Sequence, residues 1–276
     1  MDIIQRNFFR LIRSGAFNRK EQIEPMSVFK WGKLFQLAII HDVAEDVYEG
    51  LLQCKDQYFL HMTDTQWELW ENTISDLRQM PSPENLEENE FLRADHLTNP
   101  ILNRKLQAIL DDENSDTRTR QLLLTIIRTS RHILNEGVPI KELIRLGQEL
   151  RQNSSRTDFD MLDIWIKSLK FQQAANLEGT LLLELFGFEK EEVPFMDKED
   201  ESHAKDVAQE LIELTHSRSR SYYFSQGEEN IFIHTNNGSA LLGHVRRSVR
   251  YFRYFPSETI TNFFASFAHS LSNIEE

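Results

Sequence analysis

The fold is decided by residues 118–150, RTRQLLLTIIRTSRHILNEGVPIKELIRLGQEL. Apolar residues in the first half recur at three- and four-residue spacing, the pattern of one buried face of an α-helix. They are Leu122, Leu123, Ile126, Ile127, Ile133 and Leu134. Gly137 suits the end of this helix, and Pro139 suits the first turn of the next. The stretch therefore predicts a hairpin of two helices.

The second helix of this hairpin has its own apolar face. The positions on it are Ile140, Leu143, Ile144, Gly147 and Leu150. Because glycine has no side chain, Gly147 predicts that another backbone comes close to this face. The hairpin explains folding and by itself predicts no activity.

Glycine and valine are scarce in the middle of the chain. None of the ten glycines lies between Gly50 and Gly137, and no valine lies between Val47 and Val138. A central sheet needs β-branched strands and glycine-containing turns, so this interval argues against one. We expect an all-α, multi-helical scaffold. The exception is at most one small β-hairpin near residues 222–234, where Ile231 and Ile233 suit strands.

Further helices are predicted on both sides of the central hairpin. The first covers residues 3–12 and ends near Gly15. The spacing of Thr63 and Gln66 is that of a capping box, and Asn99 before Pro100 is typical of a helix start. An acidic connection, residues 111–116, leads into the central hairpin. We therefore expect an N-terminal helical lobe over residues 1–115 and a C-terminal helical lobe over residues 116–276.

The bulk composition narrows the class of protein. The chain has 31 basic and 44 acidic residues, a formal charge of −13, which disfavours general affinity for nucleic acid. No apolar run approaches the ~20 residues needed to span a bilayer. Arginines interrupt the first apolar runs, so no secretory signal is expected. The single cysteine, Cys54, excludes an internal disulfide. We expect an acidic cytoplasmic protein without a membrane span.

Five segments together carry a family resemblance. They are NFFRLIRSGAF (7–17), WGKLFQLAIIHDVAEDVYEGL (31–51), RTSRHILNEGVPIKELIRLGQEL (128–150), FDMLDIWIKSLKFQQAANLEGTLLLELFG (159–187) and RRSVRYFRYFPSE (246–258). In this order, the segments resemble an uncharacterised bacterial nucleotidyltransferase family of the Bacteroidetes. The resemblance covers about a third of the chain and implies helical parts that flank a small α/β catalytic core.

The catalytic motifs of that family are missing at the corresponding place. The family core holds a Gly-Ser turn, which cradles triphosphate, and an Asp-x-Asp pair that holds divalent metals. The corresponding interval, residues 52–118, contains no glycine. The one Gly-Ser pair, Gly238-Ser239, is followed by no aspartate. No catalytic residue can therefore be carried over, and a non-catalytic binding or scaffold protein without a cofactor is the leading hypothesis.

An active nucleotidyltransferase with a divergent metal site is the first alternative. It would use Asp158, Asp160 and Asp163 to hold Mg²⁺ with an NTP. The sequence favours a structural interpretation, because Asp158 precedes Phe159 where a helix begins.

A helical metal-binding enzyme is the second alternative. Glu213 and His216 have the spacing found in di-iron helical bundles, and Asp200 and His203 repeat it incompletely. Another polar cluster follows helical spacing: His41, Asp42, Glu45, Asp46 and Glu49. The favoured interpretation is a solvated helix face in each case, so we predict no metal site.

Two isolated residues receive structural interpretations. Cys54 belongs to no recognised nucleophile motif and is expected to be an inert thiol. His132 lies in the last turn of a predicted helix, where the helix dipole favours a cation, so we expect a capping role.

The C-terminal run HVRRSVRYFRYF, residues 244–255, carries the predicted binding site. As a helix, it would bury Val245, Val249 and Phe252. Beside them would lie an arginine ridge, defined as Arg246, Arg250 and Arg253 with Tyr251 and Tyr254. The guanidinium group of arginine can form two parallel hydrogen bonds with a phosphate or carboxylate, and the flat tyrosine rings add contact area. The ridge predicts a protein partner or an anionic small ligand. The alternative is that it pairs with the acidic residues of 184–213.

Overall fold

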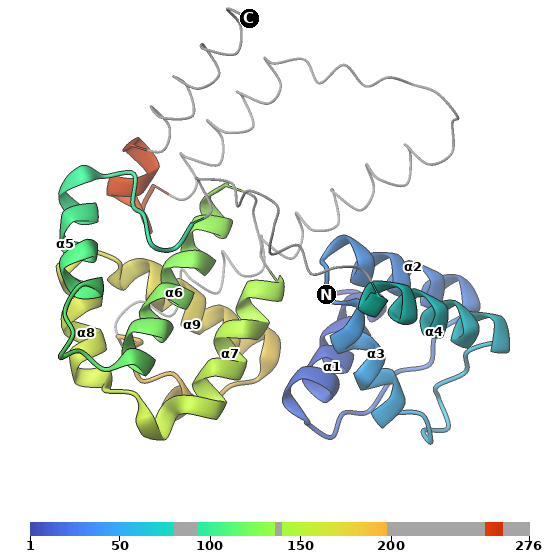
Figure 1. Ribbon diagram of the computed structural model, residues 1–276. Helices are drawn as coiled ribbons and strands as arrows, with labels where there is room; N and C mark the ends of the chain where they lie inside the picture. Colours follow the sequence, from blue (N-terminus) through green and yellow to red (C-terminus); the bar gives the residue numbers. More distant parts are fainter. Residues whose placement is uncertain (80–92, 136–139, 198–251, 262–276) are drawn as a thin grey trace, which may run out of the picture.

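The computed structural model describes residues 1–79, 93–135, 140–197 and 252–261 (Figure 1). Regular structure in these ranges is helical, and none of their residues lies in a β-strand. The expected all-α fold is confirmed. The hairpin predicted near residues 222–234 lies outside the described residues. No helix in the described part of the chain combines the length and apolar character needed to cross a bilayer.

A first group of helices comes from the N-terminal part of the chain. It consists of α1 (Ile3–Phe17), α2 (Val28–Ile40), α3 (Ala44–Gln53) and α4 (Asp64–Gln79) (Figure 1). Helix α1 ends near Gly15, as predicted: its last residue is Phe17, and Asn18 ends it in the left-handed conformation, with φ 53°. Gly15 is a packing position instead of a helix end.

A second group follows, with α6 at its centre. It consists of α5 (Pro100–Leu110), α6 (Thr117–Asn135), α7 (Ile140–Asn153), α8 (Phe159–Ser168), α9 (Gln172–Phe186) and the 3₁₀-helices η2 (Ser154–Arg156) and η3 (Lys190–Glu192). Helix α6 packs against α7, α8 and α9. Residues 256–261 add a further helical turn, drawn in red beside α5 (Figure 1).

The two faces predicted for residues 118–150 are buried in α6 and α7. The six apolar residues predicted in α6 are at most 5% exposed, and Ile140, Leu143, Ile144 and Leu150 at most 2%. The expectation for Gly147 is wrong in one respect. Aromatic rings, not a backbone, approach it: an added Cβ would lie 2.8 Å from the Phe188 ring and 2.9 Å from the Phe17 ring.

A close backbone approach occurs instead between α1 and α3. A Cβ on Gly15 would lie 1.9 Å from the carbonyl oxygen of Asp46, and one on Gly50 would lie 2.0 Å from that of Leu11. Neither distance is compatible with a side chain, so each glycine lets the facing helix backbone come into direct contact. The α1–α3 pair is the most extensive contact between elements.

Helix α1 also connects the two groups. The rings of Phe9 and Phe17 pack on Phe186 at centroid distances of 6.0 and 5.5 Å. Arg13 donates to the carbonyl oxygen of Leu185 at 2.9 Å, and Arg19 donates to that of Gly187. These arginines therefore satisfy carbonyls at the C-terminal end of α9, which no longer have partners within the helix. Both groups share one hydrophobic core.

Helix α5 lies with the second group in space. Its Lys105 donates to the carbonyl oxygen of Ser168 at the end of α8, and Arg120 of α6 donates to that of Leu110. Figure 1 shows α5 beside α8 and α6. The predicted division at residues 115/116 would assign α5 to the first lobe. In the described residues, the chain passes from one group to the other after α4.

The predicted helix starts are present at three places. Thr63 and Gln66 form the reciprocal capping box before α4, with distances of 3.3 and 3.2 Å. Asn99 accepts from the amides of Ile101 and Leu102, as expected for the cap of α5. Asp158 accepts from the amide of Met161 and caps α8. Local sequence therefore sets these boundaries.

The α1–α3 contact makes a testable prediction about stability. Gly15→Ala should destabilise the fold by about 1–3 kcal/mol or more, because a methyl group must push two helix backbones apart. Urea unfolding followed by circular dichroism measures the change.

Gly32→Ala is the matched control, since Gly32 is also in a helix but an added Cβ meets nothing within 4 Å. It should be neutral or stabilise by up to ~1 kcal/mol, the ordinary gain in helix propensity. Equal effects of the two substitutions would show that the α1–α3 approach does not constrain the fold.

Candidate functional site

The predicted arginine ridge lies mostly outside the described residues. Arg246, Arg250 and Tyr251 belong to the range 198–251, which the structure does not describe. Arg253 is exposed, whereas Tyr254 is only 4% exposed. The ring of Tyr254 therefore packs in the protein interior and does not lie on the surface beside Arg253.

The end of the predicted ridge helix has a different structure from the one expected. Residues 252–254 form a turn, and a helical segment begins at Pro256. Phe252, expected on the buried face, is 47% exposed, while Tyr254 and Phe255 are buried. Proline explains the break, because it disfavours helical geometry in the residue before it and suits the first turn of a helix.

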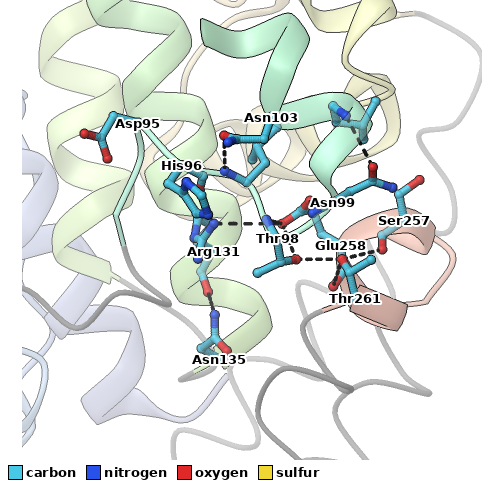
Figure 2. Close-up of polar contacts among 12 residues, drawn as sticks. Asp95, His96, Thr98, Asn99, Asn103, Arg131, Asn135, Ser257, Glu258 and Thr261 are labelled. Carbon is cyan, nitrogen blue, oxygen red and sulfur yellow. Dashed lines mark hydrogen bonds and ion pairs between the residues drawn. The ribbon is translucent and has the colours of Figure 1, made fainter. Parts of the chain in front are cut away.

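Glu258 holds this C-terminal segment against the start of α5. Its Oε2 accepts from the backbone amide of Thr98 at 3.0 Å and from the Thr98 hydroxyl at 2.9 Å. Its Oε1 accepts from the backbone amide of Asn99 at 3.0 Å. The Thr98 hydroxyl also contacts that of Thr261 at 2.6 Å. Figure 2 shows these groups converging on one carboxylate.

Arg131 of α6 completes this cluster from the other side. Its Nη1 lies 3.9 Å from Oε2 of Glu258, so the two form an ion pair, and it donates to the carbonyl oxygen of His96 (Figure 2). The Arg131 and Glu258 residues are 3% and 4% exposed. A buried charge is costly unless it is paired and hydrogen-bonded, and both conditions are met here.

In this cluster the chain holds its own carboxylate, that of Glu258. Both oxygens of Glu258 already accept hydrogen bonds, which suits a held carboxylate better than a general base. The surrounding groups all supply positive charge or hydrogen-bond donors: two amides, a hydroxyl and a guanidinium. We define the backbone amides of Thr98 and Asn99, the Thr98 hydroxyl and the Arg131 guanidinium as the anion cradle.

A second buried acid lies between α6 and α9. Oε1 of Glu178 accepts from the Ser130 hydroxyl at 2.5 Å, and its Oε2 has no hydrogen-bond partner among the described residues. Burial raises the pKa of the Glu178 carboxyl well above its ordinary value, more than the Ser130 bond lowers it. Both residues are at most 1% exposed, so this pair is enclosed by the core and is not open to a substrate.

The carboxylates of the nucleotidyltransferase alternative do not form a cluster. Asp158 caps α8, and Asp163 pairs with Lys167 one turn along the same helix at 2.7 Å. No group of three or more His, Cys, Asp or Glu side chains gathers with metal-binding geometry in the described ranges. Glu213, His216, Asp200 and His203 lie outside them.

The acidic cluster on α3 forms ion pairs, as a solvated face predicts. Glu45 and Glu49 both accept from Arg78 of α4, at 3.1 and 3.2 Å. Asp42 pairs with Lys141 of α7. Burial raises the pKa of the half-buried Asp46 carboxyl to about 6. These residues join helices to one another.

Cys54 has the environment expected of a structural residue, and His132 has the position predicted for it. His132 lies in the last turn of α6. Cys54 is buried, with its sulfur 3.8 Å from the Ser14 hydroxyl, and burial raises the pKa of its thiol. A thiol with a raised pKa forms little thiolate, so Cys54 is a poor nucleophile.

Arg131, Glu178 and Glu258 were not predicted as site residues from the sequence. A signal existed for the first two: Arg131 lies one turn after Ile127 on the apolar face of α6, and Glu178 lies in the apolar run of α9. Charged residues on buried faces are rare and indicate an internal partner. Glu258 carries no such signal, because an acidic residue shortly after a proline is ordinary in a first helical turn.

Comparison with known proteins adds no assignment: no family model, curated protein or solved structure matches the chain. The resemblance to nucleotidyltransferases therefore stays a prediction from the sequence.

The buried Glu178 makes a prediction about pH dependence. In the unfolded chain its carboxyl releases its proton near the ordinary pKa of 4.5, whereas the folded protein keeps the proton to higher pH. Stability is therefore lost as pH rises above 4.5, by up to about 1.4 kcal/mol per unit until the folded pKa is reached. Glu178→Gln removes this loss, so its stability relative to the wild type should grow as the pH rises above 4.5.

Urea unfolding at each pH tests this prediction, with Asp46→Asn as the comparison. The pKa of Asp46 is raised to about 6, so the relative gain of Asp46→Asn should level off above pH 6. Parallel stability curves for Glu178→Gln and the wild type would contradict a retained proton on Glu178.

Proposed function

We propose that this protein is a non-catalytic binding or scaffold protein, related to the helical parts of nucleotidyltransferases. The proposed binding site is the arginine ridge: Arg246, Arg250, Arg253 and Tyr251 contact the ligand, and the buried Tyr254 supports them from inside. The observation that carries this proposal is the exposed position of Arg253, directly before a segment anchored in the core. The expected occupant is a protein partner or a small anionic ligand, and the expected location is the cytoplasm of a bacterium.

The anchoring gives Arg253 a defined position. Tyr254 and Phe255 are both 4% exposed, and Phe255 packs on Phe171 with a ring-centroid distance of 6.4 Å. Three residues later, Glu258 is bonded to the start of α5. A guanidinium on a fixed backbone loses less conformational entropy on binding than one on a freely moving chain. In this proposal, Tyr254 supports the turn from inside, and Arg253 faces the ligand.

A scaffold role also agrees with the uses of the acidic residues. Asp158 and Asp163 serve helix α8 itself, as a cap and in an ion pair. Mg²⁺-dependent turnover of an NTP that disappears in Asp160→Asn would favour the active nucleotidyltransferase and contradict the proposal.

The triple variant Arg246→Ala, Arg250→Ala, Arg253→Ala tests the binding site. We expect unchanged melting and at least a tenfold loss of affinity for pyrophosphate at low salt, because charge-assisted bonds contribute about 1.5–3 kcal/mol each. Isothermal titration calorimetry measures the affinity, and circular dichroism measures the melting.

A charge-matched control separates a local site from the loss of positive charge. Arg104, Arg118 and Arg156 are exposed arginines elsewhere, and their triple alanine variant changes the net charge equally. It should retain pyrophosphate binding. If the ridge variant melts at a lower temperature and the wild type binds no pyrophosphate, the ridge is structural and the proposed site is wrong.

A further inference from the structure

The start of α5 is an anion-binding site that the chain fills with its own carboxylate. The cradle donates three hydrogen bonds of 2.9–3.0 Å to Glu258, and the Arg131 guanidinium adds an ion pair at 3.9 Å. The N-terminal end of α5 adds the positive end of its helix dipole. These groups match an oxyanion, and an oxyanion is bound there.

The carboxylate of Glu258 does not act as the N-terminal cap of α5. The helix already has its own cap, because Asn99 accepts from the amides of Ile101 and Leu102. Glu258 comes from 160 residues further along the chain and binds the amides of Thr98 and Asn99, which precede the helix. Its removal would leave the buried guanidinium of Arg131 without this anionic partner, at a substantial cost in stability.

We propose that the cradle is an oxyanion site for a carboxylate or phosphate group, and that Glu258 closes it as an internal competitor. Glu258 and Arg131 are at most 4% exposed, so an external anion enters only when residues 252–261 move away. Binding of the anion therefore releases the segment that carries Arg253. This exchange stands independently of any role of Arg253 in binding.

The competition sets the concentrations at which exchange occurs. A tethered group acts as a ligand with an effective concentration on the order of millimolar or more. The apparent affinity of an external anion is lowered by the fraction of molecules in which the cradle is open. Removal of the Glu258 carboxylate should therefore strengthen anion binding.

Glu258→Ala tests the site, with inorganic phosphate and acetate as probes in separate calorimetric titrations. We expect the variant to bind at least one probe roughly tenfold or more tightly than the wild type, because no internal carboxylate competes. The tighter probe identifies the oxyanion as phosphate or carboxylate. Glu258→Gln, which retains the side-chain volume, replaces the alanine variant if that variant does not fold.

Glu142→Ala is the matched control. Glu142 is a buried glutamate in the first turn of α7, paired with Arg145 at 2.8 Å, and no amide of the described residues donates to its carboxylate. Its removal should not produce phosphate or acetate binding. Equal gains in anion affinity for both variants would mean that anions bind wherever a buried carboxylate has been removed. The proposed site would then be wrong.

Hydrogen exchange in the wild type tests the competition itself. Addition of the tighter probe should speed exchange of the amides of residues 252–261, measured by mass spectrometry, relative to sodium chloride at equal ionic strength. Unchanged exchange at a probe concentration a hundredfold above the Kd of Glu258→Ala would overturn the proposal. Glu258 would then be a permanent structural contact.

Discussion

The direct contact between the backbones of α1 and α3 is the constraint on which the arrangement of this protein depends. Gly15 and Gly50 each remove the side chain that would hold the helices apart. Helix α1 must then present its other residues in a fixed direction, which brings Phe9 and Phe17 onto Phe186 of α9. The orientation of one helix pair therefore sets how the first group of helices meets the second.

Arginines stabilise this contact between the two groups of helices by bonding to backbone carbonyls that apolar packing leaves without a hydrogen-bond donor. Arg13 and Arg19 bond to carbonyls at the end of α9. Arg151 donates to the carbonyl oxygen of Phe17 and lies over the rings of Phe17 and Phe188. A planar guanidinium can stack and donate hydrogen bonds at the same time, which lysine cannot do. These bonds add to the left-handed caps, Asn18 and Gly187, that end α1 and α9.

Two buried acids in the second group are stabilised by different physical means. Among the described residues, Glu178 has one hydroxyl partner and no cation that lowers its pKa, so burial favours its neutral form. Glu258 has two amides, a hydroxyl and a guanidinium, which together stabilise a carboxylate. The first arrangement makes the core sensitive to pH. The second fixes a C-terminal segment to α5 and α6 and determines where Arg253 lies.

The sequence by itself determined the helical class, the apolar faces of α6 and α7, and the caps at Thr63, Asn99 and Asp158. Each depends on residues a few positions apart, whose spacing along a helix is fixed by its geometry. The arginine ridge was also predicted from local spacing, and its described end is a turn instead of a helix, because Pro256 disfavours helical geometry before it.

Tertiary structure alone decided the remaining features. Asp46, whose carbonyl oxygen faces Gly15, is 31 residues away from it, and Thr98 is 160 residues away from Glu258. Nothing in the sequence near Gly147 distinguishes an approaching ring from an approaching backbone. Such choices depend on how distant helices orient when they pack, and that orientation is set by the shape and hydrogen bonding of the whole core.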